Sequence, residues 1–170
     1  NQSGNNSMYS GFNIYFGQSF TNTNSAILDS CKFYLISLGN PSGNVVAKLY
    51  AHTGTYGDGS TGKPTGSALA TSDNVVATNI KTSGEGGPEL ITFTFSGANR
   101  ITLSAGTYYC IVLNYSGGDS SNNIKIYSDS TSPTASGNRF YSTNGTSWTA
   151  DANDVCFYVY GSYAENRCVY

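Results

Sequence analysis

The amino-acid sequence predicts an all-β protein, an antiparallel two-sheet β-sandwich of the jelly-roll kind. Eighty of the 170 residues are Gly, Ser, Thr or Asn, and these residue types favour turns over helices. Aromatic residues make up 14% of the chain and charged residues only 11%, whereas soluble domains average about 25% charged residues. Short segments alternate apolar and polar residues, and the helix-like stretch at residues 67–70 is too short to matter.

Turn signals rich in Gly, Asn and Pro separate the predicted strands. Each signal supplies a residue that tolerates positive φ or presets the turn. About ten strands are expected. They cover residues 12–20, 27–38, 44–51, 74–80, 90–95, 101–103, 107–115, 123–128, 139–142 and 155–160.

Two of these strands show a period of two clearly. In residues 31–35 the odd positions are apolar while Lys32 is charged, and Ile91, Phe93 and Phe95 alternate with threonines. Such strands have one buried face and one wetter face. Many of them, with no helices between, predict two sheets packed on one another.

The length predicts a single domain over residues 1–170, because about 100 to 200 residues make one domain. Residues 1–16 are expected to form an N-terminal arm or an edge strand, and residues 162–170 a C-terminal tail. The longest stretch without a strand pattern is residues 53–71. Loops longer than about 12 to 15 residues are often functional, so this stretch is the first candidate for a working surface.

Charge and hydropathy argue against two classes of partner. The net charge is −2, and the eight cationic residues are spread along the chain, so no basic face for nucleic acid is expected. The longest apolar stretches are the length of a strand, so insertion into a membrane is not expected either. The chain begins at Asn1 in a polar run and is interpreted as a processed or excerpted chain.

The four cysteines, Cys31, Cys110, Cys156 and Cys168, match no CxxC pattern, so a zinc site is not expected. They fit an exported protein with one or two disulfides, and equally a set of small buried hydrophobic residues. If one disulfide forms, Cys31 with Cys156 is the expected pair, because first and last strands are often neighbours in β-sandwiches.

Motifs for catalysis are weak, and the chain is not expected to be an enzyme. Residues 57–62 fit GxGxxG, but Pro64 stands where a phosphate loop needs Ser or Thr, and no helical pattern follows. The single histidine, His52, lies at the end of a predicted strand. The chain contains no GxSxG motif, which would supply a serine nucleophile. Nothing in the sequence places two carboxylates at the spacing of a glycosidase.

One weak metal candidate precedes the last strand. Asp151, Asn153 and Asp154 offer oxygen atoms of the kind that bind calcium. Asp and Asn in turns also bond their own backbone, which is the alternative interpretation. No cofactor is expected other than this possible calcium ion.

Aromatic residues in polar surroundings are the candidates for ligand contact. They are Trp148, Tyr141, Tyr127, Tyr56 and Tyr115. Their rings suit stacking on sugars, with nearby Asn, Thr and Ser bonding the hydroxyl groups. The same residues also suit a half-exposed strand or a protein interface.

Several segments, taken as an ordered set, resemble a family of jelly-roll-like β-sandwich modules found in phage virion and tail proteins and in large secreted bacterial proteins. The resemblance spans about residues 17–161, and its segments are residues 17–21, 31–35, 39–43, 47–55, 64–72, 91–97, 103–109 and 156–161. It implies a non-catalytic, outward-facing module that decorates a particle or fibre, or attaches to surface glycans. It transfers no functional residues.

The leading hypothesis is therefore a structural or adhesive module outside the cell or on a virion surface, of the phage capsid or fibre decoration type. Its expected partners are other virion or surface protein subunits, including further copies of the chain. The alternative is a carbohydrate-binding module for cell-surface glycans, with calcium as a structural ion. A glycan-cleaving enzyme is a third class, kept because fold does not determine function.

Overall fold

Two antiparallel sheets of seven strands each pack face to face in the computed structural model, which describes residues 2–129 and 136–163. The first, sheet A, has the order β1-β10-β3-β14, with β13 paired to β10 and with β7 and β8 paired to β3. Its strands are β1 (Gly4–Met8), β3 (Ala26–Leu38), β7 (Glu89–Thr94), β8 (Thr102–Leu103), β10 (Asn123–Asp129), β13 (Asp154–Val155) and β14 (Phe157–Ser162).

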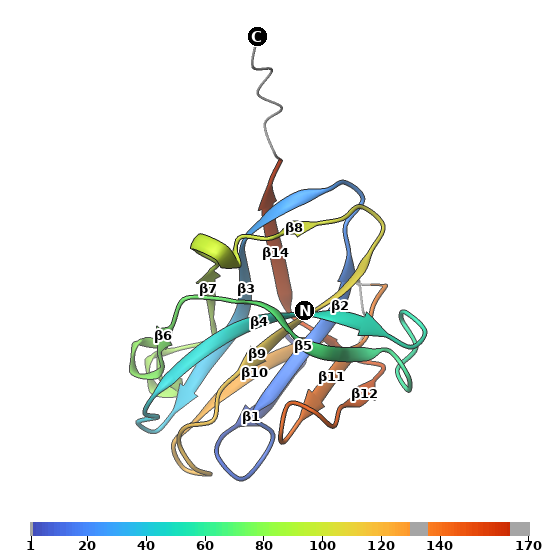
Figure 1. Ribbon diagram of the computed structural model, residues 1–170. Helices are drawn as coiled ribbons and strands as arrows, with labels where there is room; N and C mark the ends of the chain where they lie inside the picture. Colours follow the sequence, from blue (N-terminus) through green and yellow to red (C-terminus); the bar gives the residue numbers. More distant parts are fainter. Residues whose placement is uncertain (1, 130–135, 164–170) are drawn as a thin grey trace.

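Sheet B has the order β12-β11-β2-β9-β4-β5, with β6 paired to β4. Its strands are β2 (Tyr15–Thr21), β4 (Asn44–Thr53), β5 (Lys63–Thr71), β6 (Val75–Val76), β9 (Tyr108–Asn114), β11 (Arg139–Ser142) and β12 (Thr149–Asp151). The chain crosses between the sheets from β2 to β3 to β4, and again from β9 to β10 to β11 (Figure 1). This connectivity confirms the predicted jelly-roll-like sandwich.

Helical structure in the described residues is limited to three single-turn 3₁₀ segments: η1 (Ala77–Asn79), η2 (Ser83–Glu85) and η3 (Gly97–Asn99). None of the described helices has the length and apolar character of a membrane span.

The core lies between the two sheets. Cys31, Phe33 and Leu35 of β3 are fully buried, and so is Phe93 of β7, as the period of two predicted. Lys32 points the other way, and its ammonium lies 5.0 Å from the centroid of the Tyr160 ring. Each large side chain buried in this layer contributes about 1.5–3 kcal/mol to stability.

A buried polar contact joins the sheets at one end of the core. The Gln18 amide on β2 donates from Nε2 to Asp154 Oδ1 at 2.5 Å, and its Oε1 accepts from the backbone N–H of Val155 at 3.0 Å. Gln18 belongs to sheet B and the other two residues to sheet A. Because both polar ends of the amide are satisfied, its burial is tolerated and the two layers are held in one relative position.

The predicted loop at residues 53–71 is wrong over its second half. Residues 63–71 form β5, an edge strand that pairs with β4 through a β-bulge. Its small residues and Pro64 hide the strand signal, and residues 65–69 are exposed without alternation. Proline is tolerated there because an edge strand leaves one row of N–H groups unpaired.

The N-terminal segment contains β1, which pairs with β10 at the edge of sheet A and agrees with the expected arm or edge strand. Other boundaries differ from the prediction. The last predicted strand is two strands, β13 and β14, with Cys156 between them. The backbone of Cys156 bonds to Tyr127 of β10 and to Tyr34 of β3, so the chain changes neighbour there. The expected strand at residues 74–80 is only β6, followed by η1, and β12 was not foreseen.

The expected Cys31–Cys156 disulfide is also wrong. Cys31 is a free, fully buried cysteine that lies opposite Val159 of β14, three positions from Cys156 along the strand. Burial raises the pKa of the Cys31 and Cys110 thiols, which keeps them protonated and unreactive. Cys168 lies outside the described residues.

Glycine is required sterically at position 17. A Cβ atom there would lie 2.6 Å from the Phe140 ring and 2.9 Å from Val112 Cα, and it would also meet Ile111 O. The Phe140 ring of β11 therefore rests directly on the backbone of β2.

We expect Gly17→Ala to lower the free energy of unfolding by about 1–3 kcal/mol, because the added methyl group overpacks this contact. Gly87→Ala is the matched control, since Gly87 is exposed and a Cβ atom added there would meet nothing within 4 Å. Urea unfolding of the two variants measures the difference. Equal stability of both variants would contradict this account of Gly17.

Candidate functional site

The outer face of sheet B, which points away from sheet A, carries a second apolar cluster. Its buried members are Tyr50, Cys110, Val112 and Phe140, and Tyr15 and Trp148 pack against them. We call these six residues the outer cluster. Every residue of β9 from Tyr109 to Leu113 is buried, so this strand has an apolar side chain on both faces of the sheet.

Trp148 covers the outer cluster from a loop between β11 and β12. Its ring centroid lies 5.5 Å from that of Tyr15, 5.8 Å from Tyr50 and 5.7 Å from Phe140, each with the rings edge to face. This geometry is the favoured one for aromatic pairs, worth about 0.5–1.5 kcal/mol each beyond the area buried. The indole is thus held from three sides.

The loop that presents Trp148 is stabilised by its own side chains. Ser142 Oγ accepts from the backbone N–H of Gly145 at 2.9 Å, and Asn144 Oδ1 accepts from those of Thr146 and Ser147 at 2.9 and 2.8 Å. Gly145 has φ +75° and lies so close to the Tyr15 ring that a Cβ would stand 2.7 Å from it. The loop is therefore built around a glycine that a larger residue cannot replace without movement.

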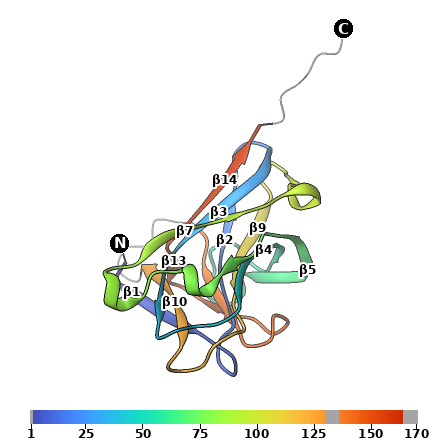
Figure 2. The ribbon, with the colours of Figure 1, turned by 90° about the vertical axis from the view of Figure 1, so that its left-hand side faces the viewer.

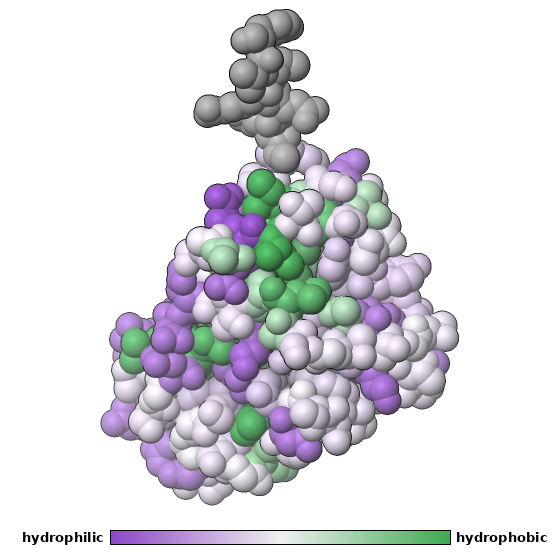
Figure 3. Space-filling view, viewed as in Figure 1, coloured by the Kyte–Doolittle hydropathy of each residue, from purple (hydrophilic) through white to green (hydrophobic). Residues whose placement is uncertain are grey.

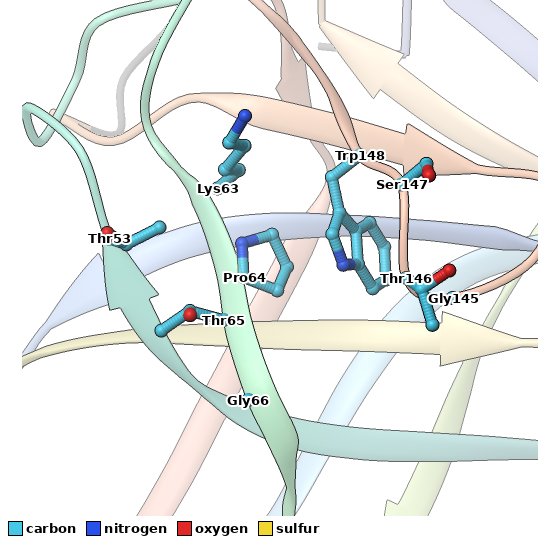
Figure 4. Close-up of a pocket in the computed structure, with 9 residues that line it drawn as sticks. All are labelled: Thr53, Lys63, Pro64, Thr65, Gly66, Gly145, Thr146, Ser147 and Trp148. Carbon is cyan, nitrogen blue, oxygen red and sulfur yellow. The ribbon is translucent and has the colours of Figure 1, made fainter.

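A pocket of about 590 Å³ lies between this loop and the start of β5. In Figure 4 the Pro64 ring extends from β5 on the side of the Trp148 indole, and Pro64 itself is buried. The other lining residues are Thr53, Lys63, Thr65, Gly66, Gly145, Thr146 and Ser147. The volume falls within the usual range for small-ligand sites, about 300–1,000 Å³.

The chemistry of the pocket combines two apolar rings with hydroxyl groups and one cation. Thr53, Thr65, Thr146 and Ser147 supply hydroxyls, and Lys63 supplies an ammonium group. No carboxylate, histidine or cysteine is among its nine described lining residues. The arrangement suits binding of a small polar ligand with an apolar face.

A second aromatic group lies beside the pocket on the same face. Tyr56 stacks on Tyr108 with ring centroids 4.2 Å apart, and His52 meets both rings edge to face at 5.8 Å. Pro64 lies opposite His52 in the β4–β5 register, which makes this group continuous with the pocket. Tyr108 keeps 47% of its surface exposed.

Residues 54–62, which include the GxGxxG match, form a loop held by internal bonds. Asp58 accepts hydrogen bonds from Ser60 and Thr61, which hold the pKa of its carboxyl below the usual value. The buried Asn138 donates from Nδ2 to Gly62 O at 2.7 Å and anchors the loop's end. The loop leads into β5 and not into a helix, so the phosphate-binding geometry is absent here.

The five aromatic residues predicted to contact a ligand do not gather in one place. Trp148 lines the pocket, and Tyr56 lies on the same face. Tyr127 belongs to β10 of sheet A, opposite Asn5. Tyr141 packs against the main core, with its ring 5.6 Å from that of Phe16.

The prediction that Tyr115 contacts a ligand is wrong, because its side chain is 0% exposed. Its hydroxyl donates to the backbone oxygen of Ser42 at 2.8 Å. Tyr115 follows the last residue of β9 and continues its inward-facing side, so it fills the core while its polar tip finds a backbone partner.

The residues predicted to bind calcium have structural partners instead. Asp151 forms an ion pair with Arg139 at 2.5 Å and accepts two hydrogen bonds from Asn153. Asp154 is buried in sheet A and accepts from Gln18. No group of three or more His, Cys, Asp or Glu side chains in residues 2–129 and 136–163 has the geometry to hold a metal ion.

Five of the nine lining residues lie in residues 53–71, the stretch predicted as the first candidate for a working surface, although it was interpreted as a loop and none of them was selected individually. Gly145, Thr146 and Ser147 were not predicted as site residues. A usable signal existed in β9, where the alternate residues Tyr108, Cys110 and Val112 are all apolar or aromatic. An apolar outward side predicts that something covers it.

Comparison with family models, with curated proteins and with solved structures found no match to the chain. The site therefore rests on its own geometry.

We expect His52 to make stability fall as the pH is lowered from about 7 toward 5. Burial lowers the pKa of His52 below 6.5, and its buried Nε2 has no hydrogen-bond partner among the described residues. In this window the unfolded chain takes up a proton more readily than the folded chain, so the free energy of unfolding decreases with falling pH.

The variant His52→Gln should lack this slope, since His52 is the only histidine. Carboxyl groups whose pKa is lowered, such as that of Asp58, affect stability only below about pH 5, where the carboxyl groups of the unfolded chain begin to take up protons, so the slope between pH 7 and 5 belongs to the imidazole. Urea unfolding at several pH values measures both proteins. Identical slopes would show that the imidazole is not protected from protonation.

Proposed function

We propose that the chain is a non-catalytic adhesive module that binds carbohydrate in the pocket between Trp148 and Pro64. A pyranose ring has an apolar C–H face and a rim of hydroxyl groups. The partly exposed Trp148 indole matches the first, and the Thr and Ser residues that line the pocket carry hydroxyl groups for the second.

The observation that carries this proposal is the way Trp148 is held. An indole packed edge to face on three aromatic rings loses little conformational entropy when a ligand binds, so the platform is preorganised. Figure 3 shows that one face of the molecule is mostly pale, the colour of weakly polar residues, with a hydrophobic patch in its upper centre and strongly hydrophilic residues scattered over it.

We expect the wild-type protein to bind a subset of glycans on an array, and Trp148→Ala to lose this binding, because the variant lacks one wall of the pocket. Thr65→Val is the milder test: it keeps the side-chain shape, removes one hydroxyl and should weaken binding about fivefold to tenfold, the worth of one hydrogen bond. Tyr127→Ala, on sheet A, should bind like wild type.

Because Trp148 is the only tryptophan, its fluorescence reports binding directly, and titration with an array-selected glycan should shift it. Thermal unfolding shows whether each variant is folded. A folded wild-type protein that binds no glycan on the array and gives no fluorescence change would refute the proposal.

A second candidate role, self-association within a surface assembly, is favoured by β14. This strand contains no charged residue between Phe157 and Ser162, and within the described residues it pairs only with β3. Figure 2 shows the two strands side by side at one end of the molecule. Tyr158 and Tyr160 on it are 47% and 43% exposed. Natural edge strands usually carry charges that prevent pairing.

If β14 pairs with β14 of a second copy, the chain should be dimeric or larger by light scattering. Tyr158→Glu should shift it to monomer, because two like charges would meet at the symmetric contact. Leu69→Glu, at an equally exposed residue of β5, is the control and should leave the mass unchanged. A monomeric wild-type chain at high concentration removes this role.

A further inference from the structure

Lys63 is the single charged residue among the described residues that line the pocket. Figure 4 shows its side chain extending from β5 beside Pro64. Within residues 2–129 and 136–163 it forms no ion pair; the ion pairs found there join Arg100 to Asp29 and Arg139 to Asp151. Its charge is therefore not neutralised by a described carboxylate.

The carboxylate nearest to Lys63 in the sequence already has hydrogen-bond partners. Asp58 lies five residues before Lys63, and its two oxygens accept from Ser60 and Thr61 at 2.7–2.9 Å. It serves the turn of its own loop.

The strands beneath the pocket contain no acidic residue at all. The sequences of β2, β4, β5 and β9 contain no Asp or Glu. They do carry a second cation, Lys48, whose ammonium lies 5.5 Å from the centroid of the Tyr15 ring at the far side of the outer cluster. The acid of sheet B, Asp151 on β12, is paired with Arg139.

The geometry points to an acidic sugar as the ligand of this pocket: a pyranose that packs against the partly exposed Trp148 indole and carries a carboxylate or sulfate bound by Lys63. The inference rests on the proposed function, since it names the class of glycan that the same site accepts. A charge-assisted hydrogen bond from an ammonium group to such an anion is about twice as strong as a neutral one. The ring stacking selects a sugar, and the ammonium selects the anion.

The test is a glycan array with neutral, uronic-acid and sulfated glycans, followed by titration of the best acidic glycan and its uncharged analogue. Wild-type protein should bind the acidic glycan at least tenfold more tightly than the analogue, and the difference should shrink as salt is raised. Lys63→Gln should remove most of this preference, and Lys63→Arg should retain it.

Lys32→Gln is the matched control. It also removes one surface cation that lies near a tyrosine ring, but on sheet A, so it should bind like wild type. The uronic-acid and sulfated sections of the array separate the two sources of negative charge. Preference for either class in the wild type, lost in Lys63→Gln, supports the inference.

Equal binding of acidic and neutral glycans by the wild type would overturn the inference and leave the proposed function standing. The same holds if Lys63→Gln keeps the acidic preference, because the anion would then be recognised by other groups. Absence of binding to every glycan by folded wild-type protein would overturn both.

Discussion

The organisation of this protein depends on one constraint: sheet B is apolar on both faces. The middle of β9 is buried residue by residue, so packing against sheet A covers only half of what must be removed from water. The outer half is covered by local means, the Trp148 loop and the aromatic side chains of neighbouring strands. A short loop cannot cover a sheet completely, and the space left between it and the β5 edge is the pocket. The candidate site thus follows from how the second face is buried.

Two contacts hold the outer cluster and the interface between the sheets in position. Gly17 lets the Phe140 ring lie on the backbone of β2, which provides the floor on which Trp148 rests. On the opposite face of the same strand, Gln18 bonds Asp154 and Val155 of sheet A. Adjacent residues of β2 therefore fix the outer cluster and the inner interface. Because the sheet is rigid between them, the position of the indole is determined by the fold and not by the loop alone.

Much of the fold could be predicted from the sequence because alternation is a local signal. Residues 31–35 and 91–95 reveal which side faces the core without any knowledge of the partner strand. β5 could not be predicted, because its side chains are small and mostly exposed. Pairing with β4 stabilises this strand, but the strand shows no alternation of apolar and polar residues. The prediction of the disulfide was wrong for a related reason. Strand order can place β14 beside β3, but only the register shows that Cys31 lies opposite Val159. Of the site, the stretch at residues 53–71 could be selected as a surface, and Trp148 and Tyr56 as individual residues. Lys63, Pro64 and Trp148 are far apart in the chain, and no local pattern joins them.

Leaving Lys63 without an internal ion pair costs the fold little. Exposed ion pairs contribute only about 0–1 kcal/mol to stability, so nothing in folding requires a carboxylate on this face.

The consequences for binding are larger. An internal partner would compete with an anionic ligand for the ammonium group, and breaking that pair would subtract from the binding energy. In a chain with only eight Lys and Arg residues, one of the few cations lines the pocket together with Trp148, next to strands β4 and β5, which contain no acid. That combination leaves the full charge of Lys63 for a ligand, and it is the reason the pocket differs chemically from the hydroxyl-rich surface around it.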